Sequence, residues 1–198
     1  GPVEVAPSAT TWLSCRTSPS AEGAPVVVTG PGLTHSAAEG RIIGEIVGVP
    51  PVSTAAAALA ALPRAQLAHF ACHARPRLDS PMFSSLVLAD GELTLYDIER
   101  LDGPPAKVIL AACDGGTAVL ASGEEVAGLA AAFLSLGSKV VVAPLFTVSD
   151  EATATMMSEL HECLAAGSDA AIALAATRDH ADPLVAFTAK SFVCFGSA

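Results

Sequence analysis

Basic residues are scarce in this chain. Its 198 residues include 10 Lys and Arg against 20 Asp and Glu, which gives a formal net charge of −10 at pH 7. Proteins that bind nucleic acids normally present a positively charged surface, so we expect no nucleic-acid partner. Charged residues of both signs make up only 15% of the chain. Few charged side chains are therefore available for the surface, and many of the alanines must lie on helix faces.

Long apolar runs and paired cysteines are also missing. No uncharged apolar stretch approaches the roughly 20 residues that a transmembrane helix needs, so we expect no membrane crossing. No basic segment followed by an apolar leader is seen either. The five cysteines are scattered and form no CxxC pair, which argues against a disulfide framework and a zinc ribbon. This pattern favours a reducing, cytoplasmic compartment.

The hydrophobic content of 52% is sufficient for one domain with a substantial core. We treat residues 1–2 as the remnant of a cleaved expression tag and expect the domain to span 3–196. Continuous apolar runs predict buried strands near 24–29, 67–72, 108–112, 139–146 and 191–196. Asp90-Gly91 predicts a hairpin between two shorter strands.

Helices are predicted between these strands. One begins near Ser36, as a possible N-cap with Glu39 three residues later, and ends at Gly48. Others begin near residues 54, 95, 123, 149 and 168. Strands that alternate with helices, each strand a continuous apolar run, predict an α/β fold with a mostly parallel sheet covered on both faces.

Two of the predicted strands end in chemically competent side chains. The apolar run in "LAHFACHARPR" ends just before His73. The apolar run in "AKVILAACDGG" ends just before Cys113, which lies 40 residues later (113 − 73 = 40). Ligands of such sheets bind outside the carboxyl ends of the strands. If the two strands are parallel neighbours, both side chains emerge at one edge of the sheet.

A cysteine thiol has an ordinary pKa of about 8.5, so at neutral pH it is mostly protonated. A nearby imidazole can take its proton and make it a nucleophile, and the glycines after Cys113 leave room for a substrate carbonyl. This arrangement is that of a cysteine hydrolase. The alternative is that each residue is an ordinary core side chain. His69 and His73 are about 13 Å apart on a strand, too far for one metal ion. "GPGL" lacks the remaining residues of a phosphate loop, so we predict no metal and no cofactor.

Six segments, in order along residues 3–196, resemble the CHAT domain, a caspase-like protease module often found beside tetratricopeptide repeats. They are "EVAPSATTWLSC", "LAHFACHA", "SSLVLADGELTLYDIERL", "VILAACDGG", the long segment that begins "SGEEVAGLAAAFL", and "DPLVAFTAKSFVCFG". The resemblance implies the caspase–hemoglobinase fold, a three-layer α/β/α sandwich. It also implies that the chain is part of a larger protein.

The resemblance further implies a catalytic dyad, with Cys113 attacking a peptide carbonyl and His73 acting as acid and base. The backbone N–H groups of Ala74 and Cys113 would form the oxyanion hole. The segment "APLFTVSD" would flank the substrate, with Phe146 where the family commonly has tryptophan and Asp150 at the family's acid. The resemblance implies two partners, a protein substrate and an upstream regulatory region or partner protein. In several bacterial systems such modules serve antiphage defence.

Three points stay open at this stage. Asp114 and Asp150 either line a pocket for a basic substrate residue or cap helices and face solvent. Ala74 replaces the usual glycine after the histidine, and alanine does not easily adopt positive φ, so the donor geometry is in question. The alternatives to a cysteine endopeptidase are a catalytically silent interaction module and a small-molecule hydrolase on the same kind of sheet.

Overall fold

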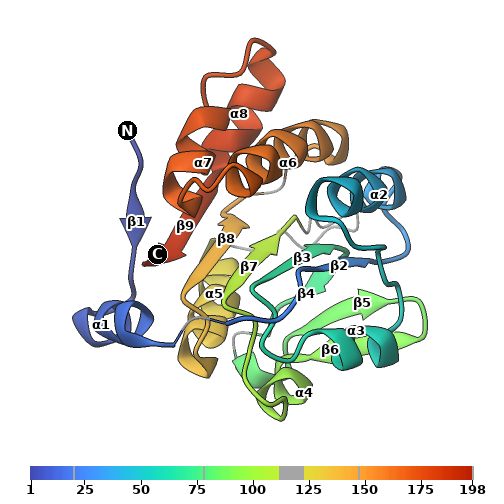
Figure 1. The fold of residues 1–198 in the computed structure, drawn as a ribbon, viewed down its shortest axis with the longest axis vertical. Coiled ribbons are helices and arrows are strands. Elements are labelled where there is room, and N and C mark those ends of the chain that lie inside the picture. Colours follow the sequence, from blue (N-terminus) through green and yellow to red (C-terminus); the bar gives the residue numbers. More distant parts are fainter. Residues whose placement is uncertain (20, 78, 112–122, 147, 198) are drawn as a thin grey trace.

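A six-stranded sheet forms the centre of the molecule (Figure 1). The computed structural model describes residues 1–19, 21–77, 79–111, 123–146 and 148–197. The strand order is β1-β9-β8-β7-β3-β2. Its strands are β1 (Glu4–Val5), β2 (Val26–Thr29), β3 (Leu67–Ala71), β7 (Lys107–Leu110), β8 (Val140–Pro144) and β9 (Phe192–Gly196). Strands β2, β3, β7 and β8 are mutually parallel, whereas β9 runs antiparallel to β8. The predicted mostly parallel sheet is confirmed.

Helices cover both faces of this sheet, which makes three layers. One face packs against α1 (Ala9–Thr17), α3 (Ala55–Ala61) and α5 (Gly123–Leu136). The other packs against α2 (Ser36–Val47), α6 (Asp150–Ala165), α7 (Ala170–Thr177) and α8 (Pro183–Ser191). Successive strand residues serve opposite cores, since Val26 and Val28 belong to the first and Val27 to the second. This is why the strands read as continuous apolar runs.

A small antiparallel sheet lies beside the carboxyl end of β3. It consists of β4 (Ala74–Arg75), β5 (Ser85–Leu88) and β6 (Gly91–Thr94), and the 3₁₀ helix η1 (Pro81–Phe83) precedes β5. Strands β5 and β6 form the hairpin that Asp90-Gly91 predicts, and Gly91 has a φ of +149°. Thr94 and Asp97 then form a reciprocal capping box that begins α4 (Leu95–Glu99).

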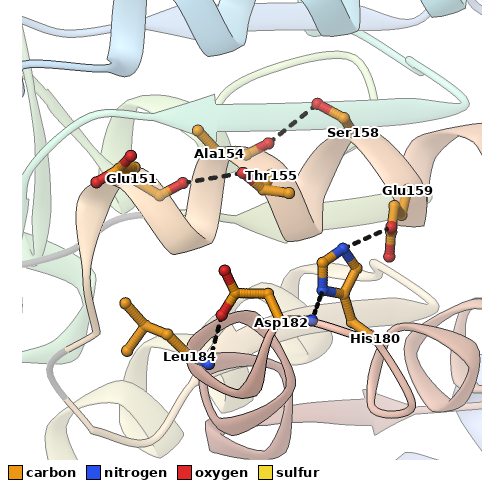
Figure 2. A network of polar contacts seen from close by, with 8 residues as sticks. All are labelled: Glu151, Ala154, Thr155, Ser158, Glu159, His180, Asp182 and Leu184. Carbon is orange, nitrogen blue, oxygen red and sulfur yellow. Dashed lines mark hydrogen bonds and ion pairs between the residues drawn. The ribbon is translucent and has the colours of Figure 1, made fainter.

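Polar contacts join the segment between α7 and α8 to α6 (Figure 2). The Nε2 atom of His180 lies 3.2 Å from a carboxylate oxygen of Glu159, and its Nδ1 accepts the N–H of Asp182 at 2.9 Å. Asp182 in turn accepts the N–H of Leu184 and so caps the start of α8. Pro183 in the first turn and this cap are ordinary helix-start signals. The sequence pattern predicts neither α8 nor α1.

The start of α2 differs from the prediction. His35 is the N-cap, and Ser36 is already the first helical residue. The Ser36 hydroxyl donates instead to the carbonyl oxygen of Gly30 at 3.0 Å, which folds the loop after β2 back on itself. Glu39 does not complete a capping box, because its side chain turns inward to His69. Among the described residues, no helix combines the length and apolarity needed to cross a membrane.

Candidate active site

The loops that follow the carboxyl ends of β2, β3 and β8 meet at one edge of the sheet. His73 follows β3, Gly30 to His35 follow β2, and Phe146 and Asp150 follow β8. These strands run in one direction, so their following residues emerge at the same edge. It is the edge at which ligands of open parallel sheets bind.

His73 is partly buried and lies against the loop after β2. A β-carbon built on Gly32 would come 2.9 Å from the Nε2 atom of His73, closer than such contacts normally allow. Gly32 also has a φ of +88°, a conformation that costs other residues free energy. Gly30 is equally confined, because an added β-carbon would overlap Cys72 and the carbonyl oxygen of Val87. Glycines at these two positions therefore let the loop approach the imidazole.

Ala74 lies in strand β4, directly after His73. Among the described non-glycine residues only Arg64 has a positive φ, so alanine is accommodated at position 74 without strain. The N–H of Val87 donates to the carbonyl oxygen of the opposite residue, His73, at 2.9 Å. In an antiparallel pair such positions alternate, so Ala74 and Leu86 form a non-hydrogen-bonded pair. The Ala74 N–H is therefore directed away from β5.

Cys113 and Asp114 lie outside the described residues, but the strand that leads to them is described. Strands β3 and β7 are adjacent and parallel, with Leu67 opposite Lys107 and Phe70 opposite Leu110. The N–H of Ala111 continues this pairing with a 3.0 Å bond to the carbonyl oxygen of Phe70. The condition stated from the sequence, that the two strands are parallel neighbours, is therefore met.

Asp150 is the first residue of α6 and joins it to the start of α2. One of its carboxylate oxygens, Oδ2, accepts the backbone N–H of His35 at 2.9 Å. Asp150 thus serves as an anchor between two helices, and it also adds negative charge at the N-terminus of α6, where the helix dipole favours it. Phe146, two residues after β8, is 67% exposed.

Three of the four described cysteines lie in environments unlike that of a reactive thiol. Cys15, Cys72 and Cys194 are buried. Burial raises the pKa of each of these thiols, to about 12 for Cys72 and Cys194. They therefore stay protonated at neutral pH and act as small core residues. Cys163 is only partly buried.

A family model described as the CHAT domain matches residues 3–183. The chain belongs to the CHAT domain family. No curated protein matches it. Of the solved structures, the Saccharomyces cerevisiae separase–securin complex is similar to this CHAT domain at 16% identity over 98% of the chain, with a TM-score of 0.63. The Arg-specific cysteine proteinase gingipain R is similar at 10% identity over 88%, with a TM-score of 0.59.

The complex of the Porphyromonas gingivalis RgpB pro- and mature domains is also similar, at 12% identity over 88% of the chain and a TM-score of 0.60. The CHAT domain spans 13% of the separase chain and 46% and 47% of the two gingipain chains. At these identities the likeness shows the fold, which is that of caspase-like cysteine proteases. The fold class inferred from the sequence is confirmed.

The structure of the CHAT domain also shows polar residues that sequence reasoning missed or misread. Glu39, His69 and His161 form a buried chain of hydrogen bonds across α2, β3 and α6. His69 belongs to this chain, and no group of three or more metal-ligating side chains is found among the described residues. The only signal in the sequence was that His69 is an isolated histidine in an apolar strand. Its partners, Glu39 and His161, lie 30 and 92 residues away and could not be inferred from it.

Proposed function

We propose that this CHAT domain is a cysteine endopeptidase in which His73 and Cys113 form the catalytic dyad. The observation that carries the proposal is the register of β3 and β7. Each described pair in these strands is separated by 40 residues, from Leu67 with Lys107 to Phe70 with Leu110. His73 and Cys113 have this same separation. Each follows the last paired residue of its strand by three positions, which favours a shared edge of the sheet.

The proposed reaction uses the partly buried imidazole of His73 as the base. His73 takes the thiol proton of Cys113, and the sulfur attacks the carbonyl carbon of a peptide bond. The N–H groups of Ala74 and Cys113 stabilise the negative oxygen that forms. His73 then gives its proton to the leaving amine. Water, deprotonated by His73, attacks the thioester, and the acid product leaves as the thiol is restored.

Three further residues are proposed to contact the substrate. Phe146 offers an exposed aromatic face beside the edge, and Asp114 and Asp150 offer carboxylates for a basic side chain. We propose that the natural substrate is a partner protein and that an upstream region or partner controls cleavage, in bacterial defence. The free state of the four described cysteines supports a reducing, cytoplasmic setting.

The test is a cleavage profile against a library of peptides from a digested proteome, with new termini identified by mass spectrometry. The unmodified chain should create new termini, and Cys113→Ala should create none while it keeps the same melting temperature. Cys163→Ala, which removes a partly buried cysteine on α6, is the matched control and should cleave like the unmodified chain. Equal numbers of new termini with and without Cys113 would overturn the dyad, and no new termini in either protein would favour a catalytically silent interaction module.

A further inference from the structure

Three titratable side chains form a continuous buried chain beneath the proposed site. Oε1 of Glu39, on α2, lies 2.9 Å from Nε2 of His69, on β3. Nδ1 of His69 lies 3.0 Å from Nε2 of His161, on α6. The exposed fractions of the three residues are 2%, 0% and 0%. The proposed dyad mechanism does not use any of them.

Burial determines the charge state of this chain. Burial, together with the nearby negative charge of Asp150 and against a smaller lowering by His35, raises the pKa of Glu39 to about 8. Burial lowers the pKa of His69 to about 3 and that of His161 well below its ordinary value. All three groups are therefore uncharged at pH 7, and the Glu39–His69 contact is a neutral hydrogen bond.

A neutral chain allows two opposite directions of donation, and the one with the stronger first hydrogen bond has the acidic O–H of Glu39 as donor to a basic imidazole nitrogen. The carboxylic acid of Glu39 donates its proton to Nε2 of His69, so His69 carries its own proton on Nδ1 and donates it to Nε2 of His161. His161 then carries its proton on Nδ1. That atom is buried and has no hydrogen-bond partner among the described residues.

The His161 end of the chain reaches a cavity of about 560 Å³. His161 lines this cavity together with Leu67, Lys107 and Val140, the first residues of β3, β7 and β8. The cavity therefore lies at the amino-terminal edge of the sheet, opposite the proposed active site.

The Glu39 end of the chain reaches the candidate active site. The N–H of Glu39 donates to the carbonyl oxygen of His35 at 2.8 Å, and the N–H of His35 donates to Asp150 at 2.9 Å. Glu39 is thus one helical turn from the residue that holds Asp150. A charge on Glu39 would repel the carboxylate of Asp150 and strain the contact between α2 and α6.

We propose that Glu39, His69 and His161 form a buried proton relay that couples the cavity at the amino-terminal edge of the sheet to Asp150 at the catalytic edge. When His161 loses its Nδ1 proton to solvent, its Nε2 takes the proton of His69. Nε2 of His69 then takes the proton of Glu39. One proton leaves in all, both histidines stay neutral as the opposite tautomers, and Glu39 becomes a carboxylate.

Other titratable groups surround the two ends of the relay. Those that act on Glu39 besides His69 are His35, Asp150 and Cys72. Those that line the cavity beside His161 are Lys107, Lys139 and Asp169. None of these groups bridges Glu39 to the cavity, so the two histidines provide the route.

The relay is tested by ¹⁵N NMR of the histidine rings between pH 6 and 9.5, with signals assigned from single histidine variants. At pH 6.5 His69 and His161 should both be protonated on Nδ1, and both should change to Nε2 together near pH 8. Glu39→Gln keeps a neutral donor to His69, so its histidines should stay Nδ1-protonated throughout. Tautomers that do not change in the unmodified chain, or an Nε2-protonated His69 at pH 6.5, would overturn the relay. The titration of the unmodified chain decides this even if the variant does not fold.

The link from the relay to catalysis rests on the proposed function and has its own measurement. Above pH 8 the peptide-cleavage rate of the unmodified chain should fall at least several-fold, and Glu39→Gln should retain its rate. The same fall in both proteins would overturn the link to Asp150. Absence of cleavage at every pH would count against the proposed function alone, because the NMR titration reports the relay independently.

Discussion

Gly32 leaves the space that the imidazole of His73 occupies: a β-carbon on Gly32 would lie 2.9 Å from Nε2. The imidazole position therefore depends on the absence of a side chain in the loop after β2. Gly32→Ala should displace the ring and also strain the backbone, because Gly32 has a φ of +88°. We expect a loss of about 1 kcal/mol in the free energy of unfolding and a roughly 10- to 100-fold lower cleavage rate.

Gly167→Ala is the matched control for this variant. Gly167 has a similar φ of +91°, but an added β-carbon would meet no atom within 4 Å. It should lose similar stability in a thermal melt and keep the cleavage rate. If both variants cleave equally well, the Gly32–His73 contact does not position the imidazole.

Thiol alkylation should single out Cys113. Cys15, Cys72 and Cys194 are buried with raised pKa values, so iodoacetamide should label them slowly at pH 7.5. Cys163 is the internal reference, because it is partly exposed. We expect Cys113 to react at least about 10-fold faster than Cys163 in peptide mass mapping, and His73→Ala to remove most of this advantage. Equally slow labelling of all five cysteines would favour the silent module.

Asp150 has two separable roles. Its carboxylate accepts the N–H of His35, and its charge is proposed to attract a basic substrate residue. Asp150→Asn keeps an acceptor oxygen, so stability should change little while any preference for basic residues in the cleavage profile declines. Asp150→Ala removes the acceptor and should lower the free energy of unfolding by about 1–2 kcal/mol. An unchanged cleavage profile in Asp150→Asn would show that Asp150 only accepts the N–H of His35 and does not select the substrate.

The stability of the chain should decrease between pH 6.5 and 8 because of Glu39. Its pKa is raised from 4.5 to about 8 by folding, so the folded chain holds this proton more tightly than the unfolded chain does. The contribution of Glu39 is complete below pH 4.5 and is lost as the pH rises through about 8. His69 and His161 have lowered pKa values, so their contribution is lost only as the pH falls below 6.5. Of these three groups, only Glu39 therefore changes the free energy of unfolding above pH 6.5.

Denaturant unfolding of the unmodified chain and of Glu39→Gln checks this expectation. Relative to the variant, the unmodified chain should lose up to about 2 kcal/mol between pH 6.5 and 8, since one proton contributes about 1.4 kcal/mol per pH unit. Parallel curves for the two proteins would show that Glu39 does not carry a raised pKa.

Most of the order of elements and the mostly parallel sheet were predictable because they depend on local patterns, whereas α1 and α8 were missed. Continuous apolar runs indicated strands buried on both faces, and Asp90-Gly91 indicated the hairpin that the structure contains. The placement of His73 after β3, and of Asp150 at the start of α6, also followed from where these runs and caps lie. The joint position of His73 and Cys113 stays a prediction, supported by the register of β3 and β7.

The sequence by itself determined the main strands, most of the helices and the position of His73 after β3, because hydrophobic period and turn residues act between near neighbours. Only the tertiary structure decided that Gly32 supports His73, that Asp150 holds His35, and that Glu39, His69 and His161 join in one chain. These contacts link residues from 30 to 115 positions apart. They depend on how three layers pack, and no local pattern encodes which buried polar groups will find one another.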